Sequence, residues 1–94
     1  MSAAGALPPV RAAAARTIRA GHDLHHSTSE DPDLALLDGD RLYAEGLAAL
    51  AAEGDLEAVR VMAGIIAASA TALARGDHQA AEQAWEQGLR DLAR

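Results

Sequence analysis

The chain has 94 residues, a net charge of −6 and no cysteine. This length predicts a single domain near the small end of what folds alone, and the absence of cysteine excludes disulfides and thiolate metal sites. Half of the residues are hydrophobic, yet they include 25 alanines, one tryptophan, one tyrosine and no phenylalanine. Because alanine favours helix but buries little area, we expect a thin core that a partner helps to complete.

Charge is unevenly distributed along the chain. Residues 30–57 carry nine acidic side chains against one arginine. This acidic middle argues against nucleic acid as a partner. The N-terminal segment lacks the basic and apolar regions of a signal peptide, and the fourteen nearly uncharged residues between Arg60 and Arg75 are too few to span a bilayer. We therefore expect a cytoplasmic protein without a transmembrane segment.

The first predicted helix covers residues 8–26. Pro8 and Pro9 suit its first turn, because proline is tolerated where no intrahelical N–H bond is needed. Its apolar side is formed by Val10, Ala14, Ile18 and Gly21. A polar break follows, which separates this helix from the next one.

The second predicted helix covers residues 32–53, with Asp31 as its N-cap and Pro32 at the first helical position. Its apolar stripe consists of Leu36, Tyr43, Leu47 and Leu50. Gly39 lies inside this helix, where glycine costs about 1 kcal/mol relative to alanine. A glycine tolerated at that cost indicates close packing against another helix.

The third and fourth predicted helices cover residues 56–75 and 77–92. Each follows a Gly-Asp pair, in which glycine ends one helix and aspartate caps the next. The third helix is apolar on nearly every side, so we expect it to be buried nearly all round. One of its faces contains Leu56, Val59, Met62, Ile66 and Leu73, and the stripe of the fourth helix contains Ala81, Trp85, Gly88 and Leu92.

No segment alternates apolar and polar residues as a strand does. The sequence therefore predicts an all-α fold of four antiparallel helices in a small bundle, with more than about 65% helix.

Two groups of side chains are candidate metal ligands. His22 and His26 lie four residues apart on one helix face, a spacing that can hold a metal ion, but no third ligand is fixed by the sequence. Glu30, Asp31 and Asp33 are closely spaced carboxylates of the kind that bind Mg²⁺. Capping of the second helix explains the carboxylates better, because Pro32 marks the helix start. We predict no catalytic residue and no resident cofactor.

Small residues on the third helix predict a close helix–helix contact, either within the chain or across a subunit interface. With the apolar residues beside them they form the candidate interface Val61, Gly64, Ile65, Ala68, Thr71 and Ala72. Three alanine-rich neighbours would cover only one broad side of this helix, and soluble monomers rarely expose large apolar patches. A two-fold dimer is the commonest closed solution.

Residues 33–77 read DLALLDGDRLYAEGLAALAAEGDLEAVRVMAGIIAASATALARGD and resemble the central helices of the trans-polyprenyl diphosphate synthase family. The matching residues are Leu37, Gly39, Asp40, Leu42, Ala44, Leu47, Gly54, Asp55, Val59, Arg60, Ala63 and Ile66. The resemblance covers about half of the chain and implies an isoprenoid-synthase-like helical fragment.

The chain departs from that family at the catalytic motifs. Family members are several times longer and use two aspartate-rich motifs to bind magnesium and the allylic diphosphate. The segment before Gly39 reads HDLHHSTSEDPD, without a DDxxD motif or paired arginines. The resemblance therefore implies a non-catalytic scaffold or small subunit associated with isoprenoid biosynthesis, with Mg²⁺ only where synthase-like binding persists. It also implies a homodimer, or a heteromer with a catalytic prenyl synthase.

An alternative resemblance involves the last helix. The segment LARGDHQAAEQAWEQGLRDL resembles the second half of a tetratricopeptide repeat, with Ala81, Trp85 and Leu89 near the second-helix positions. The Gly-Asp pairs at 54–55 and 76–77 lie 22 residues apart, whereas that repeat has a period of about 34. This alternative predicts a helical adaptor for protein–protein interaction.

Overall fold

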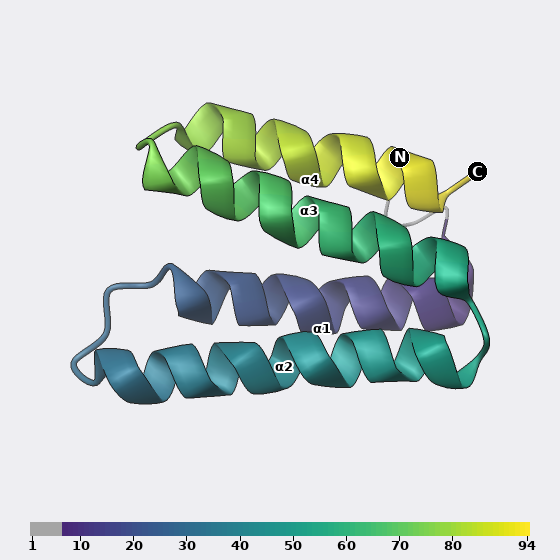
Figure 1. Ribbon diagram of the computed structural model, residues 1–94, viewed down its shortest axis with the longest axis horizontal. Helices are drawn as coiled ribbons and strands as arrows, with labels where there is room; N and C mark the ends of the chain where they lie inside the picture. Colours follow the sequence, from purple (N-terminus) through teal and green to yellow (C-terminus); the bar gives the residue numbers. More distant parts are fainter. Residues whose placement is uncertain (1–6) are drawn as a thin grey trace.

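The computed structural model describes residues 7–94 as four helices (Figure 1). They are α1 (Pro9–His25), α2 (Pro32–Ala52), α3 (Leu56–Ala74) and α4 (His78–Leu92), and they begin and end within one residue of the predicted positions. Helices make up 82% of the described residues, which contain no strand, so the predicted all-α fold is confirmed. Residues 1–6, part of the segment assessed for a signal peptide, lie outside the described residues.

The four helices form two antiparallel hairpins that pack against each other. Figure 1 shows α1 beside α2 in one hairpin and α3 beside α4 in the other. The start of α1 and the end of α4 lie at the same end of the molecule (Figure 1). This arrangement brings α1 against α4, although these two helices are the most distant in sequence.

Aspartates cap three of the helices, as predicted. The side chains of Asp31, Asp55 and Asp77 accept hydrogen bonds from the backbone N–H groups of Leu34, Ala58 and Ala80, at 3.1, 3.2 and 2.9 Å. Gly54 and Gly76 precede two of these caps with φ angles of 71° and 73°, which glycine adopts without strain. The Gly-Asp pairs therefore end one helix and start the next.

Glycines bring the backbones of α1 and α2 into contact. A Cβ atom added to Gly39 would lie 2.9 Å from the carbonyl oxygen of Gly21, and one added to Gly21 would lie 2.7 Å from that of Gly39. Two turns further along α2, a Cβ atom on Gly46 would overlap the side chain of Ile18. The close packing predicted from Gly39 is therefore confirmed, and its partner is α1.

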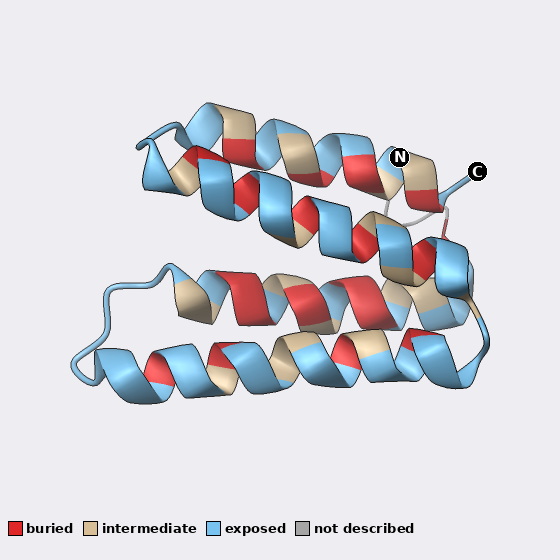
Figure 2. Cartoon of the chain, in the orientation of Figure 1, coloured by how far each residue is buried: buried red, intermediate tan, exposed pale blue. Residues whose placement is uncertain are grey.

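The core lies between the two hairpins. Its largest fully buried hydrophobic side chains are Ile18, Leu50, Met62 and Leu92, one from each helix. Figure 2 shows the buried residues as a stripe along the inner side of each helix. All four residues of the predicted α4 stripe are buried, namely Ala81, Trp85, Gly88 and Leu92. Small and large side chains alternate in this stripe, which lets α4 lie close to α3.

In the single chain α3 is buried on one side only, as expected from its few neighbouring helices. Ala63, Gly64, Ala67 and Ala70 are exposed, and so is Leu56, with 72% of its surface accessible. The other three helices cover only one side of α3. Burial on nearly every side, which the hydrophobic composition of this helix predicts, would need a partner, because a chain of this size has too few helices to surround one of them.

Two further apolar residues of the predicted stripes are exposed and do not lie in the core. Leu36 is 41% exposed and Val10 is 39% exposed. On α2 the buried positions are instead Ala35, Gly39 and Gly46, together with Leu50. The stripe of α2 is rotated relative to the prediction because the close glycine contact with α1, rather than the largest side chains, sets which face is buried.

Of the described helices, only α3 has the length and hydropathy of a membrane-spanning segment. It has 19 residues and a mean hydropathy of 1.5 over its most apolar window, of which 28% is buried. Helix α3 is longer than the uncharged run between Arg60 and Arg75, because the helix also includes Arg60 and Glu57. Core helices of soluble proteins can have the same length and hydropathy.

A salt bridge ties the start of α1 to the turn between α2 and α3. Arg11 donates two hydrogen bonds to Asp55, at 2.7 and 2.9 Å, and a third, at 2.7 Å, to the backbone carbonyl of Leu92 at the end of α4. The Arg11 guanidinium lowers the pKa of the Asp55 carboxyl group. One arginine thus joins three elements at the same end of the molecule.

The two helical glycines Gly39 and Gly64 form a matched pair for testing the α1–α2 contact. Gly39→Ala should lower the free energy of unfolding by about 1–3 kcal/mol, because its Cβ would meet a backbone oxygen that cannot move aside. Gly64→Ala should raise it by about 1 kcal/mol in dilute solution, since nothing lies within 4 Å of its Cβ. Urea unfolding followed by circular dichroism measures both, and equal effects of the two substitutions would contradict this packing.

The two caps Asp55 and Asp77 test the salt bridge in the same way. Asp77→Ala removes a cap and should cost about 1 kcal/mol. Asp55→Ala removes an equivalent cap and also the partner of Arg11, so it should destabilise the chain more. The difference should shrink in high salt and vanish in an Arg11→Gln background. Thermal unfolding of Asp55→Ala and Asp77→Ala, each alone and combined with Arg11→Gln, measures this difference. Identical losses of stability in the two aspartate variants would show that the salt bridge adds nothing.

Candidate functional site

The histidine cluster, defined as His22, His25 and His26, lies at the C-terminal end of α1. His22 is buried, with 5% of its surface accessible, and its ring stands edge-on to that of Trp85 with 5.3 Å between the ring centroids. The His26 ring lies 4.7 Å from that of His22. His25 turns the other way, stacks on Tyr43 and bonds to Asp40 at 2.9 Å. The cluster therefore faces both hairpins.

The burial of His22 disfavours its charged form. Its Nδ1 atom is buried and has no hydrogen-bond partner among the described residues. Burial lowers the pKa of His22, and the neighbouring His26 and Arg19 lower it further, against smaller opposing effects of Asp23 and Glu82. Burial also lowers the pKa of His26. The imidazole of His22 therefore stays uncharged where an ordinary histidine begins to take up a proton.

His22 and His26 share a small cavity with other polar side chains. The cavity has a volume of about 190 Å³, and Asp23, Glu82 and His78 also line it. Both carboxylates are engaged by Arg19, which bonds to Asp23 at 3.0 Å and to Glu82 at 2.6 Å. Within residues 7–94, no three histidine or carboxylate side chains converge in a geometry that could hold a metal ion. The two histidines predicted from their spacing thus form a pair without a third ligand.

The acidic candidates lie at the start of α2. Asp31 caps the helix, as its bond to Leu34 shows, and its own N–H group bonds to the Ser29 hydroxyl at 3.1 Å. Glu30 and Asp33 are exposed beside it. Asp31 therefore has the capping role favoured by the sequence.

The candidate interface residues divide between the core and the surface. Ile65 is 4% exposed and packs into the space left by Gly88 of α4, and Ala72 is also buried within the chain. Gly64, Ala68 and Thr71 are exposed on the outer side of the same helix. Val61 is half-buried between these two groups.

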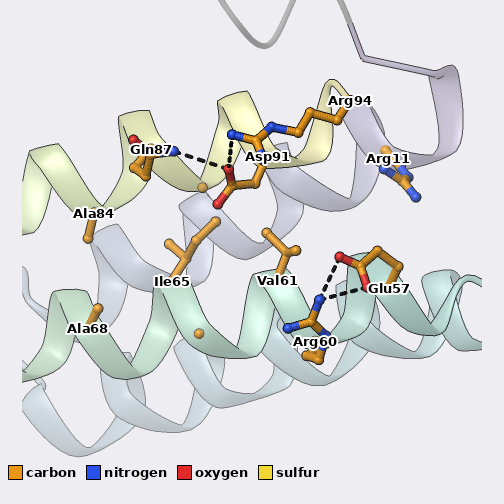
Figure 3. Close-up of a pocket in the computed structure, with 12 residues that line it drawn as sticks. Arg11, Glu57, Arg60, Val61, Ile65, Ala68, Ala84, Gln87, Asp91 and Arg94 are labelled. Carbon is orange, nitrogen blue, oxygen red and sulfur yellow. Dashed lines mark hydrogen bonds and ion pairs between the residues drawn. The ribbon is translucent and has the colours of Figure 1, made fainter.

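A shallow groove of about 540 Å³ runs between α3 and α4 on this outer side. Figure 3 shows Val61 and Ile65 rising from α3 toward α4, with Ala68 and Ala84 further along. Charged side chains lie at one end of the groove. Arg60 bonds to Glu57 at 2.7 Å on α3, and Arg94 lies 3.4 Å from Asp91 on α4 (Figure 3). The groove thus has an apolar floor of small residues and a charged end.

Two polar contacts that join the hairpins could not be predicted from the sequence. Arg11 meets Asp55 across 44 residues, and Arg19 meets Glu82 across 63. The Arg19 guanidinium also lies 5.1 Å from the centroid of the Trp85 ring. No local pattern marks these pairs, because each arginine is separated from its partner by at least one complete helix.

Buried, neutral His22 should make stability depend on pH. The pKa of His22 is lower in the folded chain than in the unfolded chain, so the unfolded state binds more protons. Acidification therefore stabilises the unfolded state relative to the folded state. The free energy of unfolding should therefore begin to fall as the pH drops through the ordinary histidine pKa of about 6.5, and it should go on falling until the lowered pKa of the folded chain is reached. His22→Gln should flatten this slope. Chemical unfolding across this range is the measurement, and an unchanged slope in His22→Gln would assign the dependence to other groups.

Comparisons of this chain with protein-family models, with curated proteins and with solved structures find no match. The resemblances to polyprenyl synthases and to tetratricopeptide repeats therefore stay predictions from the sequence.

Proposed function

We propose that this chain is a non-catalytic assembly protein that pairs with a second copy of itself through the outer face of α3. The observation that carries the proposal is the contrast between the composition and the burial of this helix. It is the most apolar of the four, yet only 28% of its most apolar window is buried in the single chain. Apolar surface of this kind favours association, because pairing removes it from water.

Gly64 adds a second reason. Four other helical glycines, Gly21, Gly39, Gly46 and Gly88, lie against a neighbouring helix, and Gly54 and Gly76 have positive φ angles. Gly64 lies in the middle of α3 with nothing within 4 Å of its Cβ position. Glycine there costs about 1 kcal/mol relative to alanine, without a benefit inside the chain. A second helix that approaches closely at Gly64 would supply that benefit.

The charges along this face favour an antiparallel partner. Gly64, Ala68 and Thr71 follow one another at helical spacing, with Glu57 near one end and Arg75 at the other. Arg75 forms no ion pair with another described residue. An antiparallel pairing centred midway between Gly64 and Ala68 sets Gly64 of one copy opposite Ala68 of the other, and Arg75 opposite Glu57. Such a contact is two-fold symmetric and closed.

The scaffold role follows from this surface together with the sequence resemblance. In polyprenyl synthases the helices that resemble residues 33–77 contribute to the dimer interface, and here the corresponding α3 carries the uncovered face. The same resemblance supplies the partner class for a heteromer, a catalytic prenyl synthase of isoprenoid biosynthesis. We commit to the homodimer because Gly64 and the terminal charges are complementary to their own copies.

Ala68→Glu tests the dimer without disturbing the fold. Ala68 is exposed in the single chain, so the substitution should leave helix content and monomer stability unchanged. In the dimer it buries an unpaired charge, which costs about 3 kcal/mol or more and should weaken pairing about a hundredfold. Sedimentation equilibrium over a range of concentrations measures the change.

Ala70→Glu is the matched control. Ala70 is also exposed on α3 but lies about 160° around the helix from Ala68, so pairing should persist. A wild-type chain that stays monomeric at high concentration would overturn the homodimer. If that monomer then co-migrated with a purified polyprenyl diphosphate synthase, the heteromer would replace it. Binding to lipid vesicles instead of self-association would assign the face to a membrane.

A further inference from the structure

A second cavity lies between α1 and α4, where the two hairpins meet. It has a volume of about 250 Å³ and shares no residue with α3. Ala12, Ala15 and Leu89 supply apolar lining, and the Trp85 ring forms part of the wall. The small side chains of the two alanines leave the space open beside a large aromatic surface. The cavity therefore suits an apolar group of the size of one ring or a short chain.

Trp85 brings an unused hydrogen-bond donor to this region. Its side chain is buried, with 3% of the residue exposed, and its indole Nε1 atom has no acceptor among the described residues. The indole N–H group can only donate. A buried donor without a partner costs about 1–3 kcal/mol, which sets this part of the hairpin junction apart from ordinary packing.

The charges around the cavity leave a positive side chain available. Arg19 lies over Trp85 and is already bonded to Glu82 at 2.6 Å and to Asp23 at 3.0 Å. Arg16 lines the same cavity and forms no ion pair with another residue of the described chain. The one carboxylate in the lining, Glu82, is thus neutralised, whereas the Arg16 guanidinium remains uncompensated. This is a local cationic site on a chain whose net charge is −6.

We propose that the α1–α4 cavity binds a small carboxylic acid with an apolar body. The carboxylate lies on the Arg16 guanidinium, whose planar donors match the two carboxylate oxygens. The apolar body fills the space between the alanines of α1 and Leu89, against the ring of Trp85. The site is independent of the proposed dimer, since its lining comes from α1 and α4 alone.

Trp85 is the sole tryptophan of the chain, so one indole signal reports on this site. Sodium hexanoate is the probe, added to the full chain while the indole N–H resonance and the tryptophan fluorescence are recorded. A saturable change in both is expected. Arg16→Gln should weaken binding about tenfold or more, because it removes the charged donor and leaves the apolar lining intact.

Two controls separate this site from nonspecific effects. Hexanol has the same chain length without the charge and should bind much more weakly than hexanoate. Arg41→Gln removes an exposed arginine of α2, outside the cavity, and should leave hexanoate binding unchanged. Both arginine variants should keep the wild-type circular dichroism spectrum. A resonance that does not saturate, equal responses to hexanol and hexanoate, or full binding by Arg16→Gln would each overturn the proposal.

Discussion

The contact between the backbones of α1 and α2 is the constraint on which the rest of this molecule depends. The carbonyl oxygen of each of Gly21 and Gly39 lies where a Cβ atom of the other would be, and Ile18 packs into the space at Gly46. A chain rich in alanine buries little area per residue, so it gains enough contact only when its helices approach closely. This approach fixes which face of α2 is buried, and it presents Ile18 and Leu50 as the surface on which the second hairpin packs.

The second hairpin contains one similar contact between a side chain and a glycine, where Ile65 occupies the space that Gly88 leaves. The two hairpins share the apolar core and are also joined by polar interactions. Arg11 bonds to Asp55 and to the end of α4, and Arg19 of α1 bonds to Glu82 and lies over the Trp85 ring, both on α4. Directional polar bonds thus supplement apolar packing at the junction between the hairpins.

The junction between the hairpins is also where the chemically distinctive groups of the chain lie. The hairpin junction holds a buried imidazole nitrogen and a buried indole nitrogen that lack partners within the described chain, those of His22 and Trp85. Buried polar groups without partners are uncommon in folded proteins, so their presence distinguishes this junction from ordinary packing. The outer face of α3 differs in kind, since it is exposed, apolar and flanked by charges. The molecule thus presents two separate surfaces with different chemistry, one that we propose for a small ligand and one that we propose for a second copy of the chain.

The sequence by itself determined the four helices, the aspartate caps of three of them, the two glycine turns and the presence of a close helix contact at Gly39. The helices, caps and turns follow from local backbone chemistry, because a cap or a left-handed glycine acts on residues within one turn of itself. The contact follows from the cost of a glycine inside a helix, which close packing offsets. The sequence did not determine that Leu36 is exposed, that His22 is buried or that Arg19 meets Glu82. Only the tertiary structure decided these features, because they depend on how the helices pack against one another. Helical periodicity fixes which residues share a face of one helix, but carries no information about which other helix covers that face.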